Sequence, residues 1–172
     1  PPNHQEIEAR AQKIRLVIMD VDGVLTDGRV LYLPGGGEAK AFHVRDGLGT
    51  QLLIASGVRV ALISGRESET VTRRADELGI RPAMQGVDDK VAAFEIILKD
   101  ADASPEQTAY IGDDLPDIPI LTRVGLGFAV ADEAQRNRLH TAGRKAQADL
   151  FPQQRRKAVT HQAVQHPPRH LG

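Results

Sequence analysis

The sequence predicts an α/β fold, a three-layer, Rossmann-like parallel sheet with helices on both faces. Residues 16–19, 58–63 and 108–111 are short apolar runs without polar alternation, which is typical of strands buried on both faces. Helical segments of about ten to fifteen residues separate the strands, as right-handed crossover connections require. Only 3% of the residues are aromatic, so Leu, Ile, Val and Ala must fill the core, which suits such a sheet.

The first half of the chain is predicted to hold a lead-in helix, a hairpin and one crossover helix. Residues 3–13 form a short polar helix or a frayed lead-in before the first strand. Residues 29–42 contain two strand-like segments around a Pro-Gly-Gly-Gly turn, a pattern typical of a β-hairpin. Asp46 is expected to cap a helix that ends before Gly57.

The second half continues the alternation of strands and helices. A helix is expected to end at Gly79, and residues 81–84 form a short edge strand. Asp88 is expected to cap the next helix, whose apolar residues share one face. Residues 115–124 are predicted to form a helix kinked by proline, and residues 126–130 the last strand.

Charge divides the chain after residue 131. Residues 1–131 hold 14 Lys/Arg and 20 Asp/Glu, whereas residues 132–172 hold 8 and 3. The second segment is also rich in Gln and contains four of the six His. The composition predicts one folded domain over residues 1–131 and a divergent, partly disordered tail over residues 132–172.

Composition also argues against several classes of protein. The chain has no Cys, so it can form neither a disulfide framework nor a thiolate metal site. Its formal net charge of −1 argues against nucleic acid or a membrane surface as a partner. No apolar run approaches the length of a membrane span, and the first residues do not resemble a signal peptide. We therefore expect a cytoplasmic location.

Polar side chains follow three of the predicted strands, and a lysine lies near a helix start. Because the carboxyl ends of parallel strands meet at one edge of a sheet, these groups are expected to converge. They are Asp20 and Asp22, then Ser64, Gly65 and Arg66, then Lys90, and finally Asp113 and Asp114.

The pair Asp20 and Asp22 predicts carboxylate chemistry. Two acids beside a buried strand repel each other and lose hydration, so a bound cation is the simplest reason to keep them. A capped Asp-Gly turn after the strand is the alternative. With a cation and a lysine to screen the charge, a carboxylate can attack a phosphoryl group and form an aspartyl-phosphate. An acid two residues later can protonate the leaving alkoxide and then activate water.

These segments resemble the four motifs of haloacid dehalogenase-type phosphatases. The matching residues are Asp20–Thr26, Ile63–Arg66, Lys90 and Gly112–Asp114. The resemblance spans roughly residues 10–131 and is sharpest to the members that hydrolyse 3-deoxy-D-manno-octulosonate 8-phosphate, a sugar-acid phosphate of lipopolysaccharide synthesis. Nonulosonate phosphatases share much of the pattern and remain an alternative.

The resemblance implies a role for each site residue. Asp20 is the nucleophile and a Mg²⁺ ligand, and Asp22 is the acid/base and offers its backbone carbonyl to the metal. Asp113 is the third protein ligand of Mg²⁺, and Asp114 is a supporting group. The phosphate-binding and substrate-binding residues are Thr26, Ser64, Gly65, Arg66, Arg74 and Lys90.

No cap domain fits between the motifs. The residues between Gly28 and Ile63 suffice only for a hairpin, a helix and a strand, and those between Arg66 and Asp113 are also used up. An open site would let water weaken its electrostatics, so the hairpin is expected to help cover it. The resemblance implies a homotetramer in which neighbouring subunits cover each site. The alternative is that the hairpin only extends the sheet.

Two arginines are expected on the substrate side. Arg66 and Arg74 lie two turns apart on one predicted helix face, and arginine suits a bidentate grip on the sugar carboxylate. His43 is expected either to line the pocket or to pack at a strand end.

The tail and two rival functions complete the predictions. Residues 133–172 lack the glycine-rich stretch and apolar helix that the family carries there, so a frameshift is one hypothesis for this segment.

A receiver domain also uses an Asp and Mg²⁺ on a parallel sheet, but it lacks an acid at the position of Asp22. A non-catalytic oligomerisation module is a further alternative.

Overall fold

The computed structural model describes residues 4–130, so the predicted tail over residues 132–172 lies outside the described residues. The α-helices are α1 (His4–Ala11), α2 (Val44–Ala55), α3 (Glu69–Leu78), α4 (Lys90–Ala101) and α5 (Ile118–Leu121). The strands are β1 (Leu16–Met19), β2 (Leu31–Tyr32), β3 (Glu38–Ala39), β4 (Arg59–Ile63), β5 (Ala83–Met84), β6 (Thr108–Gly112) and β7 (Leu126–Ala129). Short 3₁₀ turns, η1 (Pro105–Gln107) and η2 (Leu115–Asp117), precede β6 and α5. None of the helices in the described residues is long and apolar enough to cross a membrane.

Five of the strands form one parallel sheet, which confirms the predicted fold class. Their order is β5-β4-β1-β6-β7, so β1 lies at the centre. Met19, the last residue of β1, is in register with Leu62 of β4 and Ile111 of β6. The next residue, Asp20, therefore leaves the sheet between the carboxyl ends of two neighbouring strands.

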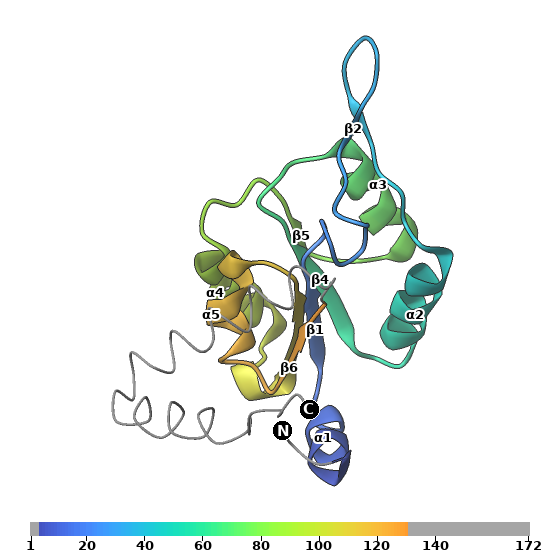
Figure 1. The fold of residues 1–172 in the computed structure, drawn as a ribbon. Coiled ribbons are helices and arrows are strands. Elements are labelled where there is room, and N and C mark those ends of the chain that lie inside the picture. The colour runs from blue at the N-terminus through green and yellow to red at the C-terminus, as the bar shows by residue number, and fades with distance from the viewer. Residues whose placement is uncertain (1–3, 131–172) are drawn as a thin grey trace, which may run out of the picture. The chain divides into compact units, whose positions relative to one another are not determined.

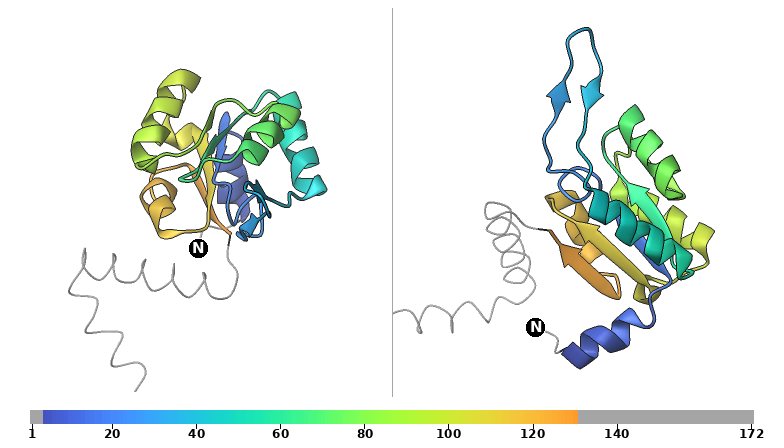
Figure 2. Two further views of the ribbon diagram at one scale, coloured as in Figure 1. Left: turned by 90° about the horizontal axis from the view of Figure 1, so that it is seen from above. Right: turned by 90° about the vertical axis from the view of Figure 1, so that its right-hand side faces the viewer.

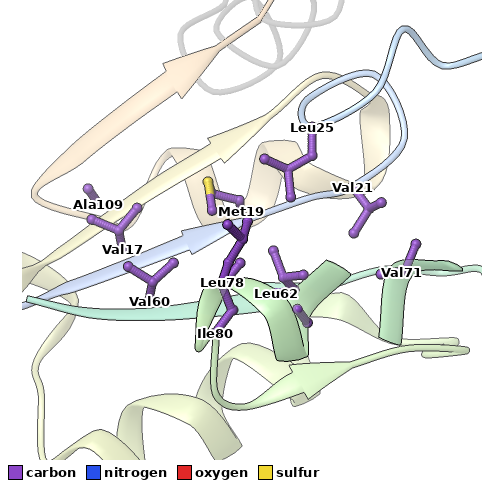
Figure 3. Close-up of a cluster of buried hydrophobic side chains, with 11 residues drawn as sticks. Val17, Met19, Val21, Leu25, Val60, Leu62, Val71, Leu78, Ile80 and Ala109 are labelled. Carbon is purple, nitrogen blue, oxygen red and sulfur yellow. The ribbon is translucent and has the colours of Figure 1, made fainter. Parts of the chain in front are cut away.

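Helices cover the sheet on both faces (Figure 1). Alternate residues of β1 point to opposite sides: Val17 and Met19 join one buried cluster, and Leu16 and Ile18 join the other. The first cluster is completed by α3 (Figure 3), and the second by α4 and α5. Because β1 is apolar on both faces, it is fixed from both sides, and so is the position of Asp20.

The hairpin predicted over residues 29–42 forms, but it does not join the main sheet. Strands β2 and β3 pair antiparallel as a separate two-stranded sheet. Gly35, Gly36 and Gly37 all have positive φ values, which lets the chain reverse at its tip. Figure 2 shows the hairpin reaching out beyond the carboxyl ends of the sheet strands. The alternative that it extends the sheet is therefore wrong.

The starts of two helices differ from the prediction. Helix α2 is capped by His43, whose Nδ1 accepts a hydrogen bond from the Arg45 N–H at 3.1 Å, while Asp46 lies in the first turn. Helix α4 is capped by Asp89 instead of Asp88, and the Asp89 carboxylate accepts from two backbone N–H groups of the first turn. Adjacent acids are equally suited to capping by type, and only the path of the backbone decides between them.

The helix predicted over residues 115–124 is much shorter. The chain makes the 3₁₀ turn η2 and then one turn of α-helix, α5. Pro116 and Pro119 lie in the first turns of these two elements instead of kinking a longer helix. Proline is tolerated there because the first N–H groups of a helix have no partner within the helix.

Candidate active site

Three buried carboxylates meet at the carboxyl edge of the sheet. Asp20 follows β1, and Asp113 and Asp117 follow β6. One carboxylate oxygen from each lies within 4.8 Å of the others, an arrangement that can hold a metal ion. Oxygen ligands are those that Mg²⁺ prefers, so this donor set fits the predicted cofactor.

Gly23 makes room for the cluster. Its φ of +92° is a conformation that residues with a side chain rarely adopt. A Cβ at this position would lie 1.9 Å from Asp113 Oδ2. The glycine that follows the Asp20–Asp22 pair therefore serves to let the carboxylate of another strand approach the first.

Lys90, the first residue of α4, contacts two of these acids. Its Nζ lies 2.7 Å from Asp20 Oδ2 and 2.8 Å from Asp117 Oδ1, and its side chain is only 9% exposed. Burial raises the pKa of Asp20, an effect that the charge and hydrogen bond of Lys90 oppose. Burial disfavours the charge on Lys90, but Asp20 and Asp117 together outweigh it and raise the lysine pKa. Lys90 thus stays cationic beside the predicted nucleophile.

Asp117, to which the sequence reasoning assigned no role, organises this edge. Its Oδ1 accepts from Lys90 Nζ and from the Tyr110 hydroxyl at 2.7 Å. Its Oδ2 accepts from the backbone N–H groups of Asp113 and Asp114, both at 3.1 Å. Asp114 itself is exposed, and its side chain accepts from the Asp117 N–H while the Asp117 side chain accepts from the Asp114 N–H, so the two acids form a capping box around η2. The Asp-x-x-Asp spacing of Asp114 and Asp117 is the sequence pattern that could have identified this role of Asp117.

Asp22 lies on the hairpin side of the site. Its carboxylate forms a short ion pair with Lys40 Nζ, and its Oδ2 lies 3.6 Å from Arg66 Nε. Arg66 Nη2 in turn lies 2.8 Å from Glu38 Oε2. Lys40 and Glu38, which the sequence reasoning did not single out, both come from the return arm of the hairpin. Only a knowledge of how the hairpin folds back would have revealed them.

Thr26 and Ser64 hold the loops at this edge. Thr26 Oγ1 accepts from the N–H groups of Gly28 at 3.2 Å and Gly23 at 3.4 Å. Ser64 is buried at the end of β4, and its Oγ accepts from the Arg66 N–H at 3.2 Å across Gly65. Thr26 therefore fixes the loop that follows Asp22, and Ser64 fixes the turn between β4 and Arg66.

Arg74 lies elsewhere. Arg66 precedes α3 and Arg74 lies within it, so the predicted shared helix face is wrong. The Arg74 guanidinium packs over the Phe42 ring at 5.7 Å, and its Nη1 lies 3.4 Å from a Glu77 carboxylate oxygen. A Cβ at Gly47 would lie 2.3 Å from Arg74 Nη2, so this arginine is seated against the start of α2.

A cleft of about 570 Å³ lies between the hairpin and the start of α3. Glu38 of β3 and Ser68, the cap residue of α3, are among its lining residues. Glu38 contacts Arg66, and Arg66 contacts Asp22, so the cleft is connected to the site through one lining residue.

Comparisons with known proteins agree with this geometry. The family model of the haloacid dehalogenase-like hydrolases matches residues 39–125. The chain is 47% identical over 131 residues to the 3-deoxy-D-manno-octulosonate 8-phosphate phosphatase KdsC of Yersinia pestis, covering 76% of this chain and 70% of that protein. The enzyme of the same name from Escherichia coli K12 is 45% identical over the same shares of the two chains.

Solved structures give the same result. The Yersinia pestis phosphatase superposes with a TM-score of 0.73 at 44% identity, covering 77% of this chain and 73% of that one. The Moraxella catarrhalis enzyme, crystallised with magnesium ion, phosphate ion and KDO, superposes with a TM-score of 0.72 at 44% identity, covering 77% and 78%. The chain therefore belongs to the haloacid dehalogenase-like hydrolases.

Proposed function

We propose that this protein is a Mg²⁺-dependent phosphatase that hydrolyses 3-deoxy-D-manno-octulosonate 8-phosphate to the free sugar acid and phosphate, within lipopolysaccharide synthesis. The observation that carries the reaction type is the buried Asp20 carboxylate, ion-paired with Lys90 and joined by Asp113 at the carboxyl end of the central strand. The relatives of about 45% identity that carry this enzyme name support the substrate.

Each acid has one task in the proposed reaction. The Asp20 carboxylate attacks phosphorus, and the bond from phosphorus to the sugar oxygen breaks as that oxygen takes a proton from Asp22. Asp22 then takes a proton from water, whose oxygen attacks the phosphorus of the aspartyl-phosphate. This second step releases phosphate and restores both carboxyl groups.

Charge must be screened because an anionic nucleophile approaches an anionic phosphate. Lys90 supplies one positive charge beside Asp20. Mg²⁺, which the Moraxella structure contains, would be held by the Asp20 and Asp113 carboxylates and the Asp22 carbonyl, and would neutralise phosphate charge. Asp117 fits less well as a direct ligand because its two oxygens already accept four hydrogen bonds.

The substrate-side residues are proposed from their positions. Lys90, which contacts Asp20, is proposed to bind the phosphate together with Ser64 and Gly65 at the end of β4, and Thr26 shapes the loop that holds Asp22. Arg66, which contacts Asp22 and Glu38, is proposed to bind the sugar carboxylate. Substrate binding by Arg74 remains a prediction. Its contacts with Phe42 and Glu77 support a role in the packing of its own subunit instead.

We also propose a homotetramer. The hairpin exposes Leu31, Tyr32 and Leu33 at and beside its outgoing strand. Helix α2 exposes a stripe of apolar residues at intervals of four, formed by Val44, Leu48 and Leu52. Large exposed apolar patches favour contact with another protein surface, which supports self-association. Light scattering during gel filtration should give four times the chain mass, and a monomer would refute the proposal. The cytoplasmic location remains a prediction.

The function is tested by phosphate release from defined sugar-acid phosphates. With Mg²⁺ present, 3-deoxy-D-manno-octulosonate 8-phosphate should have the highest kcat/KM, and a nonulosonate 9-phosphate should be a poorer substrate. The reverse order would assign the chain to the nonulosonate phosphatases. Asp20→Asn should abolish turnover of both esters while the circular dichroism spectrum is unchanged.

A further inference from the structure

The return arm of the hairpin buries one lysine beside the acid/base. Lys40 follows β3, and its side chain is 1% exposed, although the hairpin tip is open to solvent. Its Nζ forms the short ion pair with Asp22 Oδ1 and lies 3.5 Å from Glu38 Oε1. A lysine ammonium loses much hydration when it is buried, so it is retained only where anionic partners compensate.

A second cation holds Asp22 from the opposite element. Arg66, in the loop between β4 and α3, places its Nε 3.6 Å from Asp22 Oδ2. Glu38 accepts from Arg66 with one oxygen and faces Lys40 with the other. Asp22 and Glu38 therefore alternate with two cations in a closed ring, to which the hairpin contributes Lys40 and Glu38.

We propose that Lys40 is a positioning residue that fixes the Asp22 carboxylate for proton transfer and ties that orientation to the folded hairpin. This inference rests on the proposed role of Asp22. Asp22 is only partly buried, its side chain being 20% exposed, and it lies in a loop, so packing alone does not fix its rotamer. Proton transfer requires the carboxyl group within hydrogen-bond reach of the leaving oxygen. Lys40 holds the Asp22 carboxylate in that orientation before substrate binds, and the proton that Asp22 passes to the leaving oxygen arrives on the monoanionic phosphate group of the substrate.

The inference predicts a loss that depends on the leaving group. The sugar alkoxide needs a proton as it leaves, whereas p-nitrophenolate is stable without one. kcat/KM reports the steps up to release of the alcohol, so it contains the protonation by Asp22 but not the later attack by water. Lys40→Met should lower kcat/KM for 3-deoxy-D-manno-octulosonate 8-phosphate by about 10- to 100-fold. For p-nitrophenyl phosphate the loss should be less than about threefold.

Equal losses on the two esters would overturn the inference, because they would mean that Lys40 binds the phosphate or supports the whole site. No loss on either ester would overturn it as well. Lys40→Arg, which keeps the charge, should recover part of the sugar-phosphate activity. Lys99→Met, at an exposed lysine in the last turn of α4, is the matched control and should behave as the wild type.

Two further measurements keep the outcome unambiguous. If Lys40→Met does not fold, Glu38→Gln carries the test, since it removes the charge from the second partner of Lys40. Its loss of kcat/KM should be smaller than that of Lys40→Met, and again larger for the sugar phosphate than for p-nitrophenyl phosphate. A wild-type protein that hydrolyses neither ester would refute the proposed function, whereas an active wild type with equal losses in Lys40→Met refutes only the role of Lys40.

Discussion

Replacing Asp117 by Asn should destabilise the protein by a few kcal/mol, because this carboxylate is the hydrogen-bond centre of the catalytic edge. The Asp117 carboxylate accepts four hydrogen bonds, from Lys90, Tyr110 and the N–H groups of Asp113 and Asp114. An amide offers one acceptor oxygen, so two of these donors face an NH₂ group whichever way the side chain is turned. Lys90 also loses one of its two anionic partners.

The magnitude follows from these contacts. A neutral hydrogen bond contributes about 1 kcal/mol and one to a charged group about 1.5–3 kcal/mol, and buried donors left unsatisfied add to the loss. Removing one partner of a buried ion pair costs about 3–5 kcal/mol. Weaker repulsion of Asp20 offsets part of this, so we expect a loss of about 3 kcal/mol in the free energy of unfolding. The melting temperature should fall by roughly 10 °C.

Urea unfolding followed by circular dichroism measures the change, with EDTA present so that metal binding does not contribute. Tyr110→Phe is the matched control, because it removes one of the four hydrogen bonds and leaves the carboxylate in place. It should cost about 1.5 kcal/mol, roughly half of the loss expected for Asp117→Asn. If Asp117→Asn changed the free energy of unfolding by less than about 1 kcal/mol, the organising role of Asp117 would be refuted.

Three other outcomes are expected. Gly23→Ala should lower kcat by about 100-fold or more, because a Cβ would displace Asp113, while Gly35→Ala, at a similar φ but with open space around it, should retain activity. Mg²⁺ at about 100 times its Kd should stabilise the wild type by about 2.7 kcal/mol, and Asp113→Asn should abolish most of that gain in a thermal melt. Burial and the Asp117 carboxylate raise the pKa of Tyr110, so above pH 10 the unfolded chain loses this proton first and stability falls. The stability advantage of the wild type over Tyr110→Phe should therefore shrink by up to about 1.4 kcal/mol per pH unit between pH 10 and 11 in urea unfolding, and a constant difference would contradict this assignment.

The parallel sheet and the meeting of Asp20 with Asp113 followed from the sequence because both depend on simple regularities. Apolar runs on both faces predict buried strands, and parallel strands bring their carboxyl ends to one edge. The glycine-rich turn likewise predicted the hairpin. The strands and the hairpin follow from neighbouring residues, and the rule for parallel strands brings the distant Asp20 and Asp113 to one edge.

The contacts that were missed depend on how separate elements fold back on one another. Lys40 reaches Asp22 only because the hairpin turns back over the site, and no local pattern sets that direction. The sequence predicts Arg66 and Arg74 on one helix face, but α3 begins at Glu69, after Arg66. The Arg74 guanidinium packs over the Phe42 ring instead. Local spacing predicts elements, whereas side-chain partners across elements depend on tertiary packing.

The central claim, that Asp20 is phosphorylated during turnover, can be tested directly by acid quench and peptide mass spectrometry. The protein is mixed with 3-deoxy-D-manno-octulosonate 8-phosphate and Mg²⁺, quenched during steady-state turnover and digested. The account predicts a phosphoryl group on the peptide that contains Asp20, and none in Asp20→Asn, which should also release no phosphate. Phosphate release by Asp20→Asn at a rate comparable to the wild type, or a phosphoryl group on another residue, would contradict it.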